Sequence, residues 1–152
     1  MARLASPVRA IALLAGITLS GLSSVSSAVG SAKVEAVAGE GQAIRSVPRI
    51  SIAELKRLME QKAVVVLDVR DPASFARGRI PGAINIDYTQ ILAQAAQFAG
   101  ETRTIVAYCA CTNEMTAARA AVDLAAKGIA GAKALKGGWE EWVARGERIE
   151  RN

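Results

Sequence analysis

Cys109 and Cys111 carry the most distinctive chemistry in this chain. They are its only cysteines, and the 152 residues include no histidine. An apolar run over 104–108 ends directly before them, and a helical pattern begins soon after. A thiol at a helix N-terminus meets unpaired backbone N–H groups and the positive end of the helix dipole, and both favour the thiolate. Either cysteine is therefore a candidate nucleophile or metal ligand.

The spacing of the two cysteines bears on how they are used. A disulfide between residues i and i+2 closes a small, strained ring, so the spacing argues against a structural disulfide. Three uses stay open: a reactive thiol, a Cu(I) site that Met115 completes as a soft ligand, and a pair of buried, inert thiols. A copper titration distinguishes the metal site from the other two.

The N-terminal part of the sequence has the pattern of an export signal. Arg3 and Arg9 precede an apolar stretch over 10–22, and small residues that end at Ala28 follow. These features match the n-region, h-region and cleavage site of a secretory signal. The stretch is short for a membrane span, which needs about 20 apolar residues. We expect a signal peptide over residues 1–28 and an exported, periplasmic or secreted protein, which touches a membrane only if the signal stays uncleaved.

Composition and charge exclude several classes of protein. The chain is 51% hydrophobic and 22% charged, which favours a packed core over disorder. Its 19 basic and 14 acidic residues give a formal net charge of +5, but the basic residues are scattered. Nucleic-acid binding calls for basic clusters with interleaved aromatics, so we expect no nucleic-acid partner. We also expect no cofactor and no resident metal ion.

Residues 48–150 have the pattern of one α/β domain, after a small, polar segment over 29–47 that we expect to be a flexible lead-in. Ser51 and Asp71 are placed as helix N-caps, and Pro72 follows the second of them. Apolar runs over 63–69, 83–86, 104–108 and 132–135 predict strands, with helical patterns between them. Alternating strands and helices predict a mostly parallel sheet with helices on both faces. Ligands of such sheets bind beyond the carboxyl ends of the strands, where the Cys-x-Cys loop lies.

Apolar spacing also predicts which faces of two later helices are buried. One helix shows apolar residues at i, i+3, i+4 and i+7 and ends at Gly128. A terminal helix follows Gly137, and its large apolar residues share one face, which indicates core packing. The predicted core residues of the two helices are Ala118, Ala121, Val122 and Ala125, and Trp139, Trp142 and Val143.

Three segments together resemble the rhodanese-like (sulfurtransferase) family. Residues 67–86 (LDVRDPASFARGRIPGAINI) resemble its first signature, and residues 135–142 (LKGGWEEW) resemble its C-terminal signature. Between them, Tyr108 and Cys109 with the following loop and helix resemble its active-site segment. The resemblance covers about Pro48 to Gly146 and implies a rhodanese-like fold with a five-stranded parallel sheet. It also implies a cysteine that takes sulfane sulfur from a donor such as thiosulfate, holds it as a persulfide in a cradle of backbone N–H groups, and passes it to cyanide or another thiol.

The active-site segment departs from the family's pattern, in which four residues, an arginine and a small residue follow the cysteine. Counting back from Gly128 puts Cys111 at the cysteine position and Thr116 at the arginine position. Counting forward from the strand puts Cys109 at the cysteine position instead. Both registers stay open; we favour Cys111 as the nucleophile, with the other thiol modulating or resolving it. The arginine is missing in both registers and Glu114 adds a negative charge, which predicts poor use of thiosulfate.

The remaining candidate residues and partners have the following expected roles. The expected partner is a small sulfur donor or a protein thiol or persulfide, and we expect a monomer. Asp68 and Arg70 are expected to form a structural ion pair at a strand end. The alternative function is a catalytically silent rhodanese-like module that binds a partner protein. The expected substrate-binding residues are Thr112, Asn113, Glu114, Met115 and Thr116.

Overall fold

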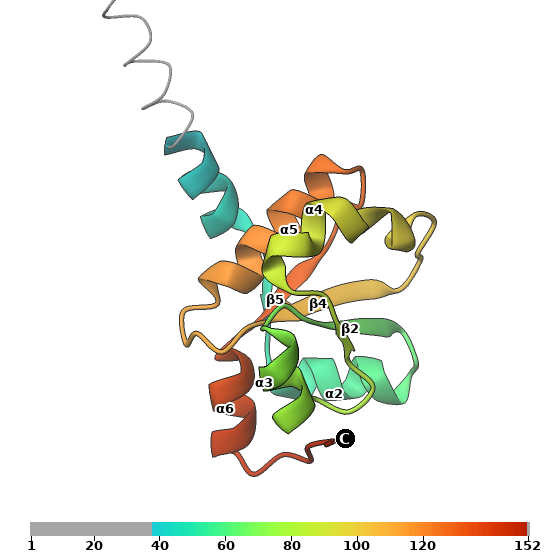
Figure 1. Cartoon of the computed structure of the whole chain (residues 1–152), viewed down its shortest axis with the longest axis vertical. Coiled ribbons are helices and arrows are strands. Elements are labelled where there is room, and N and C mark those ends of the chain that lie inside the picture. The colour runs from blue at the N-terminus through green and yellow to red at the C-terminus, as the bar shows by residue number, and fades with distance from the viewer. Residues whose placement is uncertain (1–37, 152) are drawn as a thin grey trace, which may run out of the picture.

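The computed structural model describes residues 38–151 and shows an α/β fold around a five-stranded parallel sheet (Figure 1). The strands are β1 (Arg49–Ile50), β2 (Val64–Asp68), β3 (Ile84–Asn85), β4 (Thr104–Tyr108) and β5 (Lys133–Leu135). Their order across the sheet is β1-β5-β4-β2-β3, and each neighbouring pair runs parallel. The predicted fold class is confirmed. The short strand β1 was not predicted, because two residues are too few to show an apolar pattern.

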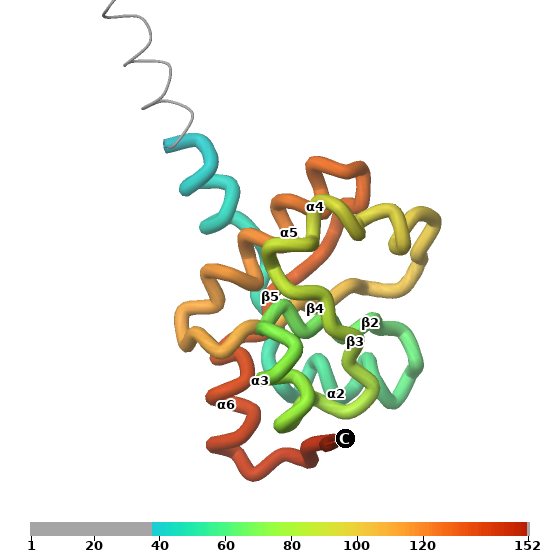
Figure 2. The backbone as a smooth tube through the Cα atoms, viewed as in Figure 1, coloured from blue at the N-terminus to red at the C-terminus, as the bar shows by residue number. Residues whose placement is uncertain are grey.

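Helices connect the strands and cover both faces of the sheet. In Figures 1 and 2, α4 and α5 lie on one face of the sheet and α2 lies on the other. One of the helical patterns between the predicted strands covers residues 88–99. In the structure this segment is divided between two 3₁₀ turns, η1 and η2, and a single α-helical turn, α4. The helical segments are α2 (Ile52–Glu60), α3 (Pro72–Arg77), η1 (Tyr88–Gln90), α4 (Ile91–Gln94), η2 (Ala95–Phe98), α5 (Met115–Ala126) and α6 (Gly138–Ala144).

Both predicted N-caps are confirmed. The hydroxyl of Ser51 accepts a hydrogen bond from the Glu54 N–H (3.1 Å) at the start of α2. The carboxylate of Asp71 accepts one from the Ser74 N–H (2.9 Å), and proline occupies the first position of α3. Each cap satisfies a backbone donor that the helix leaves free. The start of α3 is thereby fixed directly after β2, at the carboxyl edge of the sheet.

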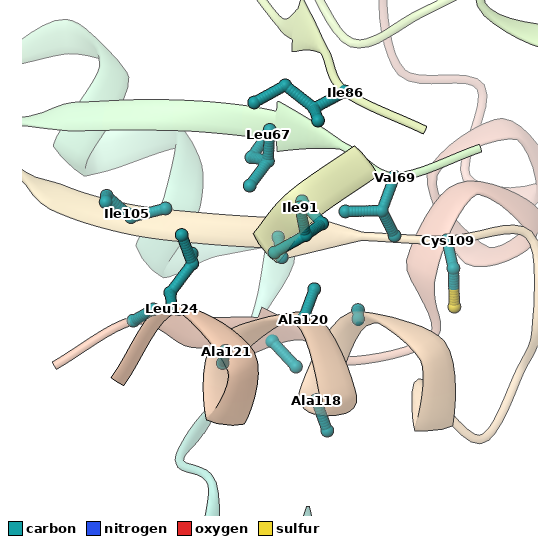
Figure 3. Packing of buried hydrophobic residues seen from close by; sticks show 14 of the residues in the cluster. Leu67, Val69, Ile86, Ile91, Ile105, Cys109, Ala118, Ala120, Ala121 and Leu124 are labelled. Atoms are coloured by element: carbon teal, nitrogen blue, oxygen red, sulfur yellow. The ribbon is translucent and has the colours of Figure 1, made fainter. Parts of the chain in front are cut away.

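Alternate side chains of the central strands enter two separate cores, as expected of a sheet covered on both faces. In the first core, Leu67 of β2 and Ile105 of β4 pack against Leu124 of α5 (Figure 3). In the second core, Val66 and Val106 of the same strands pack with residues of α2 and α6. The same alternation sends Tyr108 into the second core and its neighbour Cys109 into the first.

The buried faces of two helices differ from the prediction. In α5 the predicted core residues Ala118 and Ala121 are buried, but Ala125 is exposed. The full buried series at i, i+3, i+4 and i+7 starts one residue earlier, at Ala117, and ends at Leu124. Both series satisfy the spacing rule in an alanine-rich helix, so the apolar pattern alone does not distinguish them. In α6, Trp142 is 2% exposed but Val143 is 45% exposed, so Val143 is not part of the core.

Residues 38–46 are helical, whereas the sequence predicts a flexible lead-in as far as residue 47. Ile44 is 5% exposed and packs in the first core. The guanidinium of Arg49 donates to the Ile44 carbonyl (3.0 Å) and the Val47 carbonyl (2.5 Å), which satisfies acceptors at the end of this helix. The predicted signal peptide lies outside the described residues. Within residues 38–151, no helix is long and apolar enough to cross a membrane.

Trp142→Ala should destabilise the domain. The indole is 2% exposed, and its N–H donates to the Arg148 carbonyl (2.9 Å). Truncation of such a side chain lowers the free energy of unfolding by about 3–5 kcal/mol. Urea unfolding measures the loss, and Val143→Ala on the exposed neighbour should change stability by less than about 0.5 kcal/mol. An unchanged urea midpoint for Trp142→Ala would contradict the assignment of Trp142 to the core.

Candidate active site

The two cysteines lie in the loop that joins β4 to α5, at the carboxyl end of the parallel sheet. Tyr108 is the last residue of β4 and Met115 is the first of α5. Cys109 is 4% exposed, and its side chain points to the α5 side of the sheet (Figure 3). Cys111 is half-buried and packs against the same core. The loop therefore occupies the position that the sequence predicts, with one thiol more accessible than the other.

Cys109 and Cys111 are joined by a disulfide. The sequence argues against a structural disulfide at this spacing, but the structure joins the two sulfurs. An extended chain would separate the two Cα atoms by about 7 Å, but the loop bends at Ala110 and brings them to 5.5 Å. That separation lies within the usual range for disulfides, about 4.4–6.8 Å. The loop can therefore hold the pair in an oxidised form.

Thr116 is the side chain that the structure places beside the more accessible sulfur. Its Oγ1 lies 3.8 Å from Cys111 Sγ. Thr116 also stands where the register counted back from Gly128 places the family's arginine. A hydroxyl donor can solvate an anionic sulfur without adding charge. The candidate substrate-binding role of Thr116 is therefore compatible with its position.

Glu114 anchors the loop to the turn before α6. Its backbone is left-handed (φ 54°), a conformation that costs a residue with a side chain roughly 1–2 kcal/mol. Its carboxylate accepts a hydrogen bond from the Gly137 N–H (2.5 Å). Charge-assisted bonds of this kind are stronger than neutral ones and offset the backbone cost. Glu114 thus positions the loop, a role that the sequence does not predict.

Gly138 and Trp139 hold the other end of the loop, and sequence reasoning did not assign them to the site. The backbone N–H of Trp139 donates a hydrogen bond to the backbone carbonyl of Cys109 (2.9 Å). Gly138 has φ +54°, and a Cβ there would collide with the Cys109 carbonyl oxygen. The glycine pair 137–138 indicates a turn in the sequence, but its close approach to the Cys-x-Cys loop depends on the sheet order that places β5 beside β4.

A buried polar network lies under the loop. The Asp68 carboxylate is fully buried and binds the Arg70 guanidinium through Nε (2.9 Å) and Nη2 (2.5 Å), so the predicted ion pair is present. The Tyr108 hydroxyl donates to the same carboxylate (2.5 Å) and accepts from the Ile80 N–H (3.2 Å). The Arg70 guanidinium also lies 4.3 Å from the ring centre of Trp139. Among the described residues, no buried side-chain nitrogen or oxygen lacks a hydrogen-bond partner.

The other predicted site residues face solvent. Thr112 is exposed, and Asn113 uses its side-chain oxygen to accept from the Met115 N–H (3.4 Å). Met115 is 42% exposed and is not part of the core. Within residues 38–151, no group of three or more His, Cys, Asp or Glu side chains could hold a metal ion. The structure thus brings Cys109, Cys111 and Thr116 into direct contact.

Two cavities flank the Cys-x-Cys loop. The first, of about 370 Å³, is lined by Thr112 and Glu114 on the loop side and by Lys136, Glu141 and Arg145 on the other. The second, of about 340 Å³, is lined by Ala110, the residue between the cysteines. Its other walls include Arg77, Trp139, Glu140, Val143 and Arg151. The loop is therefore open to ligands from two sides.

The phenol of Tyr108 should resist ionisation. Burial raises its pKa above the usual 10.0, and the Asp68 carboxylate raises it further. Because the folded-state pKa exceeds the unfolded one, the fold favours the neutral phenol. This stabilisation is complete below pH 10 and is lost as the pH rises above it. Tyr88→Phe leaves Tyr108 as the only tyrosine, and its tyrosinate absorbance should appear only as the protein unfolds. In urea the same variant should titrate near pH 10; ionisation there in the folded protein would contradict the network.

Glu114→Ala should lower the free energy of unfolding by about 1–3 kcal/mol, because it removes a charge-assisted hydrogen bond and leaves the Gly137 N–H without its partner. Urea unfolding measures the loss. Glu60→Ala, at an exposed glutamate at the end of α2, is the matched control and should shift stability by less than about 0.5 kcal/mol. Equal effects of the two substitutions would show that Glu114 does not anchor the loop.

Comparison with known proteins bears directly on this arrangement. The family model of the rhodanese-like domain matches residues 51–145. Thiosulfate sulfurtransferase GlpE of Pseudoalteromonas translucida is 30% identical over 103 residues, which cover 67% of this chain and 95% of GlpE. An HTH-type transcriptional regulator of Mycobacterium tuberculosis is 36% identical over 104 residues; these cover 66% of this chain but only 44% of the regulator.

Solved structures of other proteins share this fold. The BH2092 protein of Bacillus halodurans superposes with a TM-score of 0.63 at 26% identity, over 78% of this chain and 86% of that one. The human single-domain sulfurtransferase TSTD1 superposes with a TM-score of 0.57 at 25% identity, over 66% of this chain and 98% of that one. Since the family model covers more than half of its length, the chain belongs to the rhodanese-like domain family.

Proposed function

We propose that this protein is a sulfurtransferase that carries sulfane sulfur as a persulfide on Cys111 and resolves it with Cys109. The observation that carries the proposal is the placement of two cysteines, close enough to bond, in the loop after β4. The similarity to GlpE, a protein named as a thiosulfate sulfurtransferase, supports sulfur transfer as the reaction type.

Accessibility favours Cys111 as the thiol that receives sulfur. Cys111 is half-buried and has the Thr116 hydroxyl beside its sulfur, whereas Cys109 is 4% exposed and lies among core residues. A nucleophile must reach its donor, and a hydrogen-bond donor near its sulfur favours the thiolate. Cys109 is suited to react only with a group that Cys111 already holds.

The reaction has two steps. The Cys111 thiolate attacks the outer sulfur of a donor R–S–S⁻; the new S–S bond forms on Cys111 and the thiolate R–S⁻ leaves. An acceptor thiolate can then take the outer sulfur and release the Cys111 thiolate. Alternatively, the Cys109 thiolate attacks the inner sulfur, which forms the Cys109–Cys111 disulfide and releases hydrosulfide. An external dithiol must reduce that disulfide before the next cycle.

The charge of the loop restricts the donor. The family's loop arginine is absent, and within the loop itself, residues 109–114, the only charged side chain is Glu114. A doubly charged anion such as thiosulfate therefore lacks the cation that would stabilise it at the sulfur. Organic persulfides, which bring a single negative charge at the reacting sulfur, are the better donors.

Mass spectrometry of cysteine variants tests the proposal. The protein is first reduced, freed of reductant and treated with an organic persulfide. Cys109→Ser should accumulate one additional sulfur on Cys111, because the resolving thiol is gone. Cys111→Ser should gain none, and the wild type should release hydrosulfide and form the disulfide.

Wild-type protein alkylated at both thiols before treatment is the control for sulfur bound elsewhere. Sulfur on Cys109 in the Cys111→Ser variant, with none on Cys111 in the Cys109→Ser variant, would reverse the two roles. If neither thiol gains sulfur from any donor, the catalytic proposal is wrong, and a silent binding module takes its place.

A further inference from the structure

The Cys109–Cys111 disulfide contributes little to holding the fold together. It closes a ring over residues 109–111 alone, and the constraint that a disulfide places on the unfolded chain grows with the length of the closed loop. The loop is held without it, because the backbone N–H groups of Trp139 and Gly137 bind the Cys109 carbonyl and the Glu114 carboxylate. The bond can therefore open and close while the domain stays folded.

The two sulfurs of this disulfide differ in access. Cys109 is 4% exposed, and its side chain points into the core on the α5 side of the sheet (Figure 3). Cys111 is half-buried, and its neighbours Ala110 and Thr112 are exposed. Thiol–disulfide exchange begins when an external thiolate attacks a sulfur that it can reach. Attack therefore falls on Cys111 and releases the thiolate of Cys109.

The position of Cys109 decides which attacking thiols succeed. After the attack the incoming thiol is bonded to Cys111, and the released Cys109 thiolate stays two residues away in a loop that is fixed at both ends. Cys109 can attack Cys111 again and expel the incoming thiol, with the advantage of an intramolecular reaction. A monothiol is expelled in this way, whereas the second thiol of a dithiol competes and completes the reduction. The loop therefore favours dithiols as electron donors.

The surface next to Cys111 in the loop carries no charge. Residues 109–113 include no charged side chain, and the carboxylate of Glu114, which follows them, is held by the Gly137 N–H. A disulfide carried on another polypeptide can approach such a surface without burying an unpaired charge. The site is therefore open to protein disulfides as well as to small ones. The exposed residues of this surface are Ala110, Thr112, Asn113 and Met115.

We propose that the Cys109–Cys111 pair is a dithiol–disulfide exchange site, which takes electrons from a dithiol and passes them to disulfides of other proteins. The inference goes beyond the proposed function, because no sulfane sulfur takes part in this reaction. Cys111 is the sulfur that exchanges with the partner, and Cys109 is the thiol that resolves the mixed disulfide.

Each half-reaction balances in atoms and electrons. A thiolate of the dithiol bonds to Cys111 Sγ, the Cys109–Cys111 bond breaks, and Cys109 leaves as a thiolate that takes up a proton. The second thiolate of the dithiol attacks its own sulfur in the mixed disulfide, which oxidises the dithiol to a disulfide and releases the Cys111 thiolate. In the other half-reaction, Cys111 attacks a substrate disulfide and Cys109 resolves the product. The Cys109–Cys111 bond forms again, and the substrate leaves as two thiols.

Reduction of insulin by dithiothreitol tests the exchange in the absence of sulfane sulfur. The protein is first treated with excess dithiothreitol, which also removes persulfide sulfur, and is then desalted. Wild type should raise the rate of insulin reduction above that with dithiothreitol alone. Cys111→Ser should abolish the increase, and Cys109→Ser should lose most of it because its mixed disulfide has no resolving thiol. Arg57→Gln, at an exposed arginine on α2, is the control and should leave the increase unchanged.

A monothiol tests the preference for dithiols. With 2-mercaptoethanol at the same thiol concentration, wild type should raise the rate of insulin reduction by a smaller factor, because Cys109 expels the monothiol from Cys111. An equal factor with both reductants would overturn the assignment of a dithiol as the electron donor.

Mass spectrometry of mixed disulfides identifies the sulfur that is attacked. Cys109→Ser should accumulate a mixed disulfide between Cys111 and an insulin chain, whereas Cys111→Ser should form none because Cys109 is 4% exposed. A mixed disulfide on Cys109, or a rate of insulin reduction that neither cysteine variant changes, would overturn the exchange site. Reduction of the disulfide should lower the urea midpoint by less than Trp142→Ala does. A larger loss would identify a structural disulfide and would also overturn the proposal.

The two proposals fail separately. If the protein catalyses insulin reduction but neither thiol gains sulfur from an organic persulfide, the proposed sulfur transfer is wrong and the exchange site stands. If a thiol gains sulfur but the rate of insulin reduction equals that with dithiothreitol alone, the exchange site is wrong and the proposed sulfur transfer stands.

Discussion

The fully buried carboxylate of Asp68 is the constraint on which the site depends. A buried charge is tolerated only where a counter-ion and hydrogen bonds compensate its desolvation, and here Arg70 and Tyr108 supply both. The Arg70 guanidinium in turn stacks on the ring of Trp139. The backbone N–H of Trp139 donates a hydrogen bond to the Cys109 carbonyl. Satisfying one carboxylate therefore fixes the ends of β2 and β4 and the start of α6 relative to one another.

The Cys-x-Cys loop is held at both ends by the glycine turn before α6 and by the first residues of α6. Cys109 is bound through its carbonyl and Glu114 through its carboxylate, and the glycine at 138 allows the close approach. Between these anchors the chain bends at Ala110, which brings the two cysteines within bonding reach. Anchoring a short loop in this way limits the conformations of the thiols and so favours their reaction with each other.

Membership of the family limits the chemistry but does not define it. The relatives include a sulfurtransferase named for thiosulfate and a transcriptional regulator, so one fold serves proteins of different kinds. The features of this chain that bear on its chemistry are the second cysteine of the loop and the hydroxyl of Thr116 beside Cys111. These features, not the fold, are the basis for proposing a less charged donor.

The sequence by itself determined the fold class, the N-caps at Ser51 and Asp71, the position of the cysteines after β4 and the ion pair at the end of β2. These depend on local patterns or on a contiguous family signature, which are visible in one dimension. Tertiary structure alone decided the buried face of α5, where an alanine-rich helix offers two series with the same spacing. It also decided that Glu114 binds Gly137, that Gly138 and Trp139 hold the loop, and that Val143 is exposed beside a cavity. Each of these depends on which strand lies next to which, because parallel neighbours such as β4 and β5 are far apart in the chain.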